Sequence, residues 1–391
     1  MAELILEAPR SEGGQVEVAA RFTSASGEHR LWYRIEQERR NALAPNADPF
    51  VLGTIHLAMK TGENLLVHGQ VAPSLLANLE VLQQAWSTWK PGLYQQVDVR
   101  ATTEKEAGLP QRNAAISSFT GGVDSCFTAF RHARGVTTRF PLPLRAAVMA
   151  HGFDIPLSDE VGYQRASAKA ERQLKTLGLE LYRIASNFRE LPVSWVDSFG
   201  AAVASALALF QGGFDTGLLA SGIPFGAYRT LVEGENPITD PLLSSAAFKI
   251  VADGAGFQRI DKIGALVQWR EGLDDLRVCA VNQIRDQNCC ECEKCIRNIL
   301  CFRALGLVLP SAFAKDITRQ QILDLVPLKE MKIDIGYAAV LQTAERRGLG
   351  DEAWVRALRR TVRLSRLYHQ LRRVRGGMRI WRLMRLLGRV V

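Results

Sequence analysis

From Ala114 to Gly222 the sequence alternates between short apolar runs and longer segments that have the apolar spacing of a helix. The runs are AAISSF (114–119), RAAVMAHGF (145–153), LELYRIASN (179–187) and DTGLLASG (215–222). Strands that alternate with helices in this way pair in parallel and carry the helices on the faces of the sheet. The sequence therefore predicts an α/β fold on a parallel sheet, and we expect KIVADGAGFQRIDKIGAL (249–266) to add a helix and short connections.

Small or polar residues follow each of the four predicted strands. Because the carboxyl ends of parallel strands meet at one edge of a sheet, these residues are expected to lie near one another, where ligands bind in open α/β sheets. The four strand ends are Phe119-Thr120, Gly152-Phe153-Asp154, Ser186-Asn187 and Ser221-Gly222.

The connection after the first predicted strand has the composition of a phosphate-binding loop. Residues 118–125 read Ser-Phe-Thr-Gly-Gly-Val-Asp-Ser. Glycines let the backbone approach an anion closely, and the first N–H groups of the following helix point towards it. The loop lacks Gly-Lys-Ser/Thr, which excludes a Walker A site. The alternative is an ordinary strand–turn–helix connection.

This loop resembles the Ser-Gly-Gly-x-Asp-Ser loop of the PP-loop ATP pyrophosphatases, with Thr120 in place of the first serine. The resemblance extends from about Ala114 to Arg303 and implies a five-stranded parallel sheet of the adenine-nucleotide α-hydrolase type. It also implies Mg²⁺–ATP as a ligand, with pyrophosphate on the loop. The nucleotide-binding residues would be Ser118, Phe119, Thr120, Gly121, Gly122, Asp124 and Ser125, joined from the strand ends by Gly152, Asp154 and Ser221.

Catalytic roles implied by the same resemblance fall on Asp124 and Ser125, together with a cation further along the chain. Arg259 and Lys262 are three residues apart and face the same way on a helix. PP-loop enzymes often use such a downstream cation to neutralise phosphate, which makes Lys262 a candidate. The alternative is a solvated surface pair.

Five of the seven cysteines lie within residues 289–301. Reduced, clustered cysteines in a large chain indicate a metal site more than a disulfide framework. Zn²⁺ prefers four sulfur or nitrogen ligands in a tetrahedron, and closely spaced cysteines reach one ion with little strain. Iron–sulfur binding and the absence of a metal remain alternatives, although Cys301 departs from ferredoxin spacing. The candidate ligands are Cys279, Cys289, Cys292 and Cys295.

The cysteine spacing resembles the zinc site of the 7-cyano-7-deazaguanine synthases, a branch of the PP-loop enzymes. A basic helical segment, KCIRNILCFRALG, follows the cluster here as well. Cys290 stands where that branch has glycine. The resemblance implies a structural Zn²⁺.

The basic character of the chain belongs to its last 39 residues. The net charge is +9, but residues 353–391 hold 12 Arg and no Lys or acid, and subtracting these charges leaves −3 on the remainder. An apolar stripe at steps of three and four predicts a basic amphipathic helix that breaks at Gly376-Gly377. The helix could contact an anionic membrane surface, grip RNA, or dock on protein. The stripe comprises Leu364, Leu367, Leu371, Val374, Met378 and Trp381.

The N-terminus reads MAELILEAPR, without the basic start and apolar core of a signal peptide, and no apolar run reaches membrane-spanning length. We therefore expect a cytoplasmic protein, with the tail as a route to the inner membrane surface. We expect four parts: an N-terminal α+β module, 1–110; a PP-loop domain, 111–275; a Cys-rich segment with helices, 276–350; and the Arg-rich tail, 351–391.

The N-terminal module is expected to contain strands at VEVAARF, HRLWYRI, VLGTIHLAM and QQVDVRA and a helix at LLANLEVLQQAWSTW. No chemistry motif is found there. In the second part, the polar segment 226–248 offers candidates for substrate recognition, or else it caps the next helix. The candidates are Arg229, Glu233, Glu235, Asn236 and Asp240.

The function that these features predict is an ATP-dependent adenylating enzyme, a C–N ligase of the 7-cyano-7-deazaguanine synthase type. It would activate a small or macromolecular carboxylate or amide for attack by ammonia or an amine, releasing AMP and pyrophosphate. One alternative is an RNA-thiolating PP-loop enzyme. The other is a non-catalytic nucleotide-binding accessory protein that is tethered by its basic tail.

Overall fold

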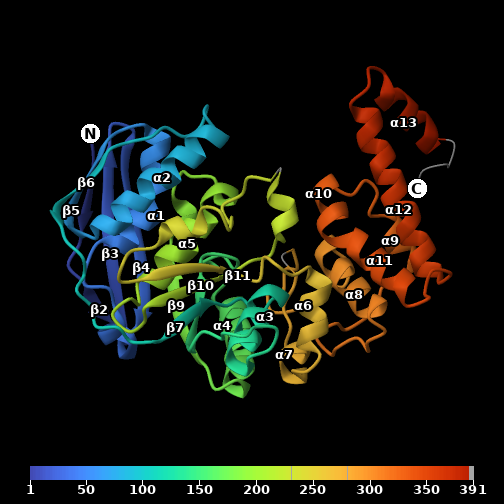
Figure 1. Ribbon diagram of the computed structural model, residues 1–391, viewed down its shortest axis with the longest axis horizontal. Coiled ribbons are helices and arrows are strands. Elements are labelled where there is room, and N and C mark those ends of the chain that lie inside the picture. The colour runs from blue at the N-terminus through green and yellow to red at the C-terminus, as the bar shows by residue number, and fades with distance from the viewer. Residues whose placement is uncertain (230, 280, 387–391) are drawn as a thin grey trace. The chain divides into compact units, whose positions relative to one another are not determined.

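The computed structural model describes residues 1–229, 231–279 and 281–386, and the chain divides into two compact units. Unit 1 contains the β-sheet, and unit 2 contains the cysteine-rich segment and the C-terminal helices (Figure 1). Unit 1 comprises Met1–Gly222 and Thr230–Ala255, and unit 2 comprises Ile223–Arg229 and Gly256–Val391.

Five parallel strands form one half of the sheet in unit 1, in the order β11-β10-β7-β8-β9. This confirms the parallel sheet predicted from the alternating pattern. The segment 249–266 was expected to add a helix and short connections. The helix is found at Arg259–Leu266, but β-branched residues at the start of the segment form a fifth strand that was not expected there. The strands are β7 Ala115–Ser118, β8 Leu144–His151, β9 Glu180–Ser186, β10 Thr216–Ala220 and β11 Lys249–Asp253.

Three helices connect these strands: α3 (Val123–Arg134), α4 (Glu160–Thr176) and α5 (Trp195–Ala208). The connections β7-α3-β8 and β8-α4-β9 step in one direction across the sheet, whereas β9-α5-β10 steps back past β7. Because such crossovers are right-handed, α3 and α4 cover one face and α5 covers the other. Figure 1 shows this division.

The N-terminal strands extend the same sheet. β4 pairs antiparallel with β9, Tyr33 to Ile35 facing Ile184 to Ser186, so the sheet has eleven strands instead of the five expected. This pairing covers the edge that β9 would otherwise expose. The added strands are β1 Ala2–Leu6, β2 Arg10–Glu12, β3 Gln15–Ser24, β4 Gly27–Glu36, β5 Leu65–Val71 and β6 Val99–Glu104.

Residues 1–110, expected to be a separate module, thus lie in one compact unit with the parallel strands. The predicted strand at residues 51–59 was wrong, since helix α1 (Asp48–Thr61) occupies it. Its residues are buried nearly all round, which hides helical periodicity in the sequence. Pro49 lies in its first turn, and Gly62 ends it at φ +69°. The predicted helix α2 is found at Pro73–Trp89.

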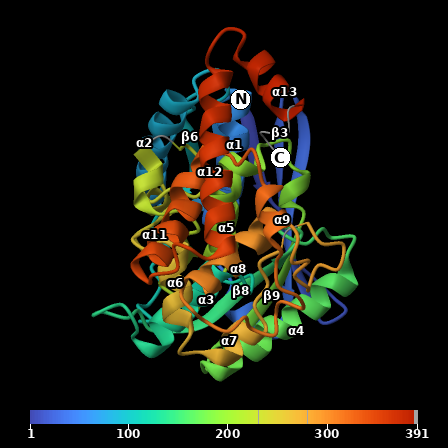
Figure 2. The same ribbon diagram turned by 90° about the vertical axis from the view of Figure 1, so that its right-hand side faces the viewer.

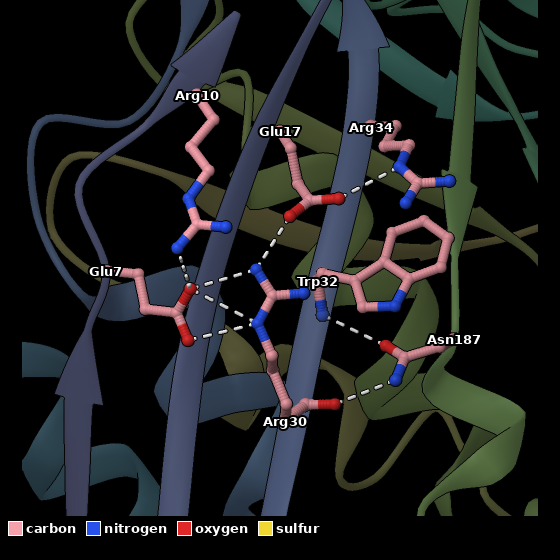
Figure 3. Close-up of polar contacts among 7 residues, drawn as sticks. All are labelled: Glu7, Arg10, Glu17, Arg30, Trp32, Arg34 and Asn187. Carbon is pink, nitrogen blue, oxygen red and sulfur yellow. Dashed lines mark hydrogen bonds and ion pairs between the residues drawn. The ribbon is translucent and has the colours of Figure 1, made fainter. Parts of the chain in front are cut away.

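A polar network covers part of β3 and β4 and joins β4 to the end of β9 (Figure 3). The Arg30 guanidinium lies 2.9 Å from Glu7 and 2.6 Å from Glu17. The Asn187 side chain accepts a hydrogen bond from the Trp32 N–H (3.0 Å) and donates one to the Arg30 carbonyl (2.7 Å). Asn187 was expected among the strand ends that bind a ligand. Its side chain instead continues the hydrogen bonding between β9 and β4.

Unit 2 is mostly helical. α6 and α11 pack on α8, and α12 packs on α9 and α11. The predicted break of the tail is found, since α12 ends at Arg372 and Gly376 adopts φ +80°. None of the described helices has the length and apolar content needed to cross a membrane. The helices are α6 Arg259–Leu266, α7 Arg270–Asp274, α8 Glu293–Ala304, α9 Arg319–Leu323, α10 Glu330–Lys332, α11 Ala338–Arg346, α12 Ala353–Arg372 and α13 Gly377–Leu386, with a π-helical turn at Ile333–Tyr337.

Short 3₁₀ helices complete both units. They are η1 Gln37–Ala42, η2 Phe188–Glu190, η3 Phe225–Arg229 and η4 Asp240–Leu243.

Candidate functional sites

The glycine loop of residues 119–122 lies at the point of the sheet where the strand order reverses. β7 has β8 on one side, reached through α3, and β10 on the other, reached through α5. Because these connections leave on opposite faces, the loop lies at a topological switch point, which is where open α/β sheets bind ligands beyond the carboxyl ends of their strands. Chain topology therefore makes the loop after β7 a candidate binding site.

The loop has a backbone conformation that depends on glycine. Gly121 adopts φ +72°, and Gly122 is the N-cap of α3. The Ser125 hydroxyl accepts a hydrogen bond from the Thr120 N–H (3.1 Å) and donates one to the Gly122 carbonyl (3.1 Å). Ser125 thus holds the turn closed, while the first amides of α3 point beyond the N-terminus of the helix.

Ser118 and Phe119 continue the sheet into the loop. The Phe119 N–H donates to the Val148 carbonyl at 2.8 Å, and the side chain is 1% exposed. The Ser118 hydroxyl accepts a long hydrogen bond from the Ala220 N–H (3.4 Å). These two predicted binding residues fix the start of the loop against both neighbouring strands.

Two carboxylates lie close to the backbone just beyond β10. A Cβ atom at Gly222 would lie 3.4 Å from Asp124 Oδ2 and 3.6 Å from Glu235 Oε2. The Glu235 carboxylate also accepts a hydrogen bond from the Gly222 N–H (2.5 Å). Hard cations such as Mg²⁺ prefer carboxylate oxygens, so this pair could contribute ligands to one. Glu235 appeared in the sequence only as a candidate for substrate recognition.

Asp240, another recognition candidate, is fully buried. Its carboxyl accepts a hydrogen bond from the Asn236 N–H at 3.0 Å, and burial raises its pKa well above the usual value. The same segment packs tightly against Gly200 of α5, since a Cβ atom at Gly200 would lie 2.0 Å from the Gly234 carbonyl oxygen. Asp240 therefore holds the segment that carries Glu235. The capping alternative was wrong in its detail, because Asp240 is buried, Thr239 is the N-cap of η4, and no side chain caps this helix.

Gly152 and Asp154 lie in the turn after β8. Gly152 adopts φ +96°, and a Cβ there would lie 2.0 Å from the Ser186 carbonyl. Its N–H donates to the Ile155 carbonyl (2.8 Å). Only glycine fits at this approach of the chain to β9, so packing alone accounts for Gly152. Asp154 is exposed.

Ser221 lies next to a carboxylate that the sequence analysis overlooked. The buried Ser221 donates its N–H to the Asp253 carbonyl (2.8 Å) at the end of β11. The Asp253 carboxylate accepts hydrogen bonds from Thr128 (2.7 Å), Arg131 (2.8 Å) and His132 (3.1 Å) of α3. Burial opposes ionisation, but these partners together lower the pKa of Asp253 below the usual value. Asp253 thus clamps the helix that carries Asp124 and Ser125.

Lys262 belongs to α6 in unit 2 and is 1% exposed, which disagrees with a solvated surface pair. The same unit contains a second buried cation, Arg297, whose Nε lies 3.4 Å from Glu293 Oε1. Burial, and then the charge of Arg297, lowers the pKa of Lys332 to about 8. The sequence analysis missed Arg297 and Lys332, because Glu293 and Arg297 have the spacing of an ordinary helical ion pair.

The structure brings the four predicted cysteines of unit 2 together. Their sulfur atoms all lie within 4.8 Å of one another, with Cys279–Cys289 at 3.5 Å, Cys279–Cys292 at 3.8 Å and Cys289–Cys295 at 3.9 Å. A tetrahedral ion with metal–sulfur bonds of about 2.3 Å places its sulfur ligands about 3.8 Å apart. The four thiols could therefore hold one metal ion.

Asn288 holds the two parts of this cluster together. Its side-chain oxygen accepts hydrogen bonds from the Val278 N–H (2.8 Å) and the Cys279 N–H (3.1 Å). Its amide nitrogen donates to the carbonyls of Leu276 (2.8 Å) and Ala312 (2.9 Å). The sequence analysis missed this residue, since only the fold shows what the buried amide bonds to.

Backbone groups also favour thiolates here. The N–H groups of Glu291 (3.4 Å) and Cys292 (3.3 Å) donate to the Cys289 sulfur. Cys292 precedes α8 and Cys295 lies in its first turn, where the helix dipole favours negative charge. Hydrogen bonding between this pair lowers the pKa of Cys292 to about 5 and raises that of Cys295. A bound dication would favour thiolate at both.

Cys290 stands apart from the four ligands. It is fully buried, and its thiol donates to the Asn288 carbonyl (3.6 Å). Its φ of +58° lies in the left-handed region that favours glycine. A glycine at this position would adopt the same conformation without strain.

No model of a known protein family matches the chain, and no match is found among curated proteins or solved structures.

Proposed function

We propose that the chain is an ATP pyrophosphatase of the PP-loop type that adenylates a carboxylate or amide. The observation that carries this proposal is the position of the glycine loop. It follows the strand at which the order of the parallel sheet reverses, and it opens α3 with Gly121 at φ +72°. The resemblance of residues 118–125 to the PP-loop agrees with this topology.

In the proposed reaction, the main-chain amides that follow Thr120, in residues 121–125, bind the β- and γ-phosphates of ATP. Asp124 and Glu235, which both lie near Gly222, would contribute ligands to Mg²⁺. An oxygen of the substrate attacks the α-phosphorus, the bond to the β-phosphate oxygen breaks, and pyrophosphate leaves. Ammonia or an amine then attacks the activated carbon and expels AMP. Positioning and charge stabilisation suffice, and no nucleophilic side chain is required.

We propose Zn²⁺ for the four-cysteine site, in a structural role. Three of the sulfur separations are 3.5–3.9 Å and all are within 4.8 Å, which fits four ligands on one ion. In a cubane iron–sulfur cluster each cysteine binds a different iron, which spreads the sulfurs further apart. All four ligands come from protein, as in closed structural sites. Bound Zn²⁺ would join the segment around Cys279 to the start of α8.

The RNA-thiolating alternative is less well supported. It needs an accessible cysteine to carry sulfur, but the three cysteines outside the four-cysteine site are buried. These are Cys126, Cys290 and Cys301.

The proposal is tested with full-length, metal-loaded protein, labelled ATP and Mg²⁺. Wild-type protein should bind ATP and release AMP and pyrophosphate when ammonia and a suitable carboxylate are supplied. Asp124→Asn should lower pyrophosphate release about a hundredfold or more. The control is Asp98→Asn, which replaces an exposed carboxylate directly before β6, at the other end of the strand order. This substitution should not change pyrophosphate release.

Absence of ATP binding to wild-type protein would overturn the proposal. ATP binding without turnover, across a panel of carboxylates and amides, would instead support the non-catalytic accessory protein.

A further inference from the structure

The C-terminal helices of unit 2 present an unusual concentration of arginine. Residues 353–391 hold 12 Arg and no acid. Acids from elsewhere in the unit pair with Arg359 (Glu345, 3.1 Å), with Arg373 (Glu330, 2.9 Å) and, more loosely, with Arg366. Among the described residues, no ion pair involves four exposed arginines near the end: Arg372, Arg375, Arg379 and Arg382.

Trp381, the aromatic residue of the predicted apolar stripe, packs inside the protein. Figure 2 shows α13 turning back beside the end of α12. Trp381 is 4% exposed, and its ring packs edge-on against Tyr368 at 5.0 Å. Trp381 is therefore not available to contact a membrane. Its packing agrees with the alternative in which the helix docks on the protein itself.

Other apolar side chains, including Val374 of the predicted stripe, are exposed to water. Val374 is 62% exposed, Ile380 52% and Leu383 57%. Ile380 and Leu383 lie one helical turn apart, so they share a side of α13. Each directly follows an exposed arginine, Arg379 or Arg382. We call this set the α13 face: Arg379, Ile380, Arg382 and Leu383 on α13, with Val374 and Arg375 in the turn that precedes the helix.

This mixture discriminates between partners. Nucleic acid would engage the arginines through phosphates but leave Ile380 and Leu383 in water. A membrane surface rich in anionic lipid accommodates both kinds of side chain, with cations at the headgroups and apolar side chains at the acyl boundary. A surface of this kind lies on the bilayer without crossing it, which agrees with the lack of a spanning helix among the described residues.

We propose that the α13 face docks on an anionic membrane surface and holds the protein there peripherally. Each side chain contributes weakly to membrane affinity, and the contributions of the α13 face add together. Each arginine near such a surface contributes about fivefold to affinity at low ionic strength. The proposal does not depend on the adenylating activity, because the α13 face contains none of the residues assigned to the nucleotide or metal sites.

Co-sedimentation of the full-length protein with vesicles tests this proposal. Protein should bind vesicles of phosphatidylcholine mixed with phosphatidylglycerol and not vesicles of phosphatidylcholine alone. Arg379→Gln with Arg382→Gln should lower the affinity about twentyfold. Ile380→Ser with Leu383→Ser should lower it as well, and should abolish the binding that survives a high-salt wash.

Matched controls come from exposed residues elsewhere in unit 2. Val308→Ser replaces a side chain that is 92% exposed, and Arg270→Gln replaces one that is 89% exposed. Neither should change vesicle binding, and thermal unfolding should show that all variants fold.

Two results would overturn the proposal. One is an equal affinity for both kinds of vesicle. The other is binding to a homopolymer RNA that competes with vesicles and is unaffected by the Ile380 and Leu383 substitutions, which would identify a nucleic-acid surface.

Discussion

The two candidate sites are built from different atoms. In unit 2 the chemistry lies in side chains, four sulfur atoms within 4.8 Å of one another. In unit 1 it lies mainly in the backbone, in a turn with Gly121 at φ +72° and in the first amides of α3. A thiolate site can be predicted from the spacing of cysteines along the sequence. A backbone site can be recognised only when its position in the sheet is known.

This difference determines how each site fails. A side-chain site loses its function when one ligand is removed, whatever the backbone does. A backbone site tolerates many side-chain changes and fails when its conformation or its supporting helix is disturbed. The two units should therefore respond to different substitutions, and independently of each other.

The largest effect is expected when a cysteine ligand or the metal is removed. Cys292→Ala, or a strong chelator, should remove Zn²⁺ and unfold the region around α8, because binding energies of about 10 kcal/mol or more support structural zinc sites. Metal analysis and thermal unfolding measure both effects. The buried Cys301 serves as control, and Cys301→Ala should keep one metal per chain. Full metal content in Cys292→Ala would refute the four-cysteine site.

The next effect concerns the residue that positions the ligands. Asn288→Ala should cost about 3 kcal/mol of stability and weaken metal binding about 10- to 100-fold, because four buried backbone groups lose their partner. Competition with a chromogenic chelator measures the affinity. Asn282→Ala, which removes loop hydrogen bonds that do not involve the cysteines, should leave it unchanged. Equal losses in both variants would mean that Asn288 supports folding in general.

Unit 1 should be sensitive to the clamp on α3. Asp253→Asn should destabilise unit 1 by about 2 kcal/mol at neutral pH, because hydrogen bonds to a charged group are lost. Since the fold lowers the pKa of Asp253, its contribution is complete above the unfolded value of about 3.9 and disappears as pH falls through the folded value. Urea unfolding across acidic pH should therefore bring wild type and variant together. A constant difference would contradict this account, and metal content should not change.

The sequence predicted much of the parallel half of the sheet, because each strand carries its own apolar run and each helix its own periodicity. It did not predict the pairing of β4 with β9, since no local sequence pattern indicates which strand pairs with the edge of a sheet. Helix α1 was mistaken for a strand because burial on nearly all sides removes the polar face that marks a helix.

The candidate sites divide in the same way. The four cysteines could be chosen from spacing alone, and the structure brings them together. Asn288, which supports them, could not be chosen from the sequence, because it bonds to backbone groups that are 9 to 24 positions away. Glu235 and Asp253 reach the region of the loop from other segments, which only the fold brings close to α3.

The smallest change in stability, and the sharpest test of the backbone site, comes from two glycines that bracket α3. Gly121 precedes the helix at φ +72°, and Gly135 ends it at φ +66°. Alanine at either position should cost about 1 kcal/mol, because both require the left-handed region. Only Gly121→Ala should also weaken ATP binding, since it disturbs the turn that presents the amides. Equilibrium dialysis with labelled ATP, beside urea unfolding, separates the two effects. If both variants bind ATP as wild type does, the nucleotide does not rest on this turn, and the contrast between a backbone site and a side-chain site fails.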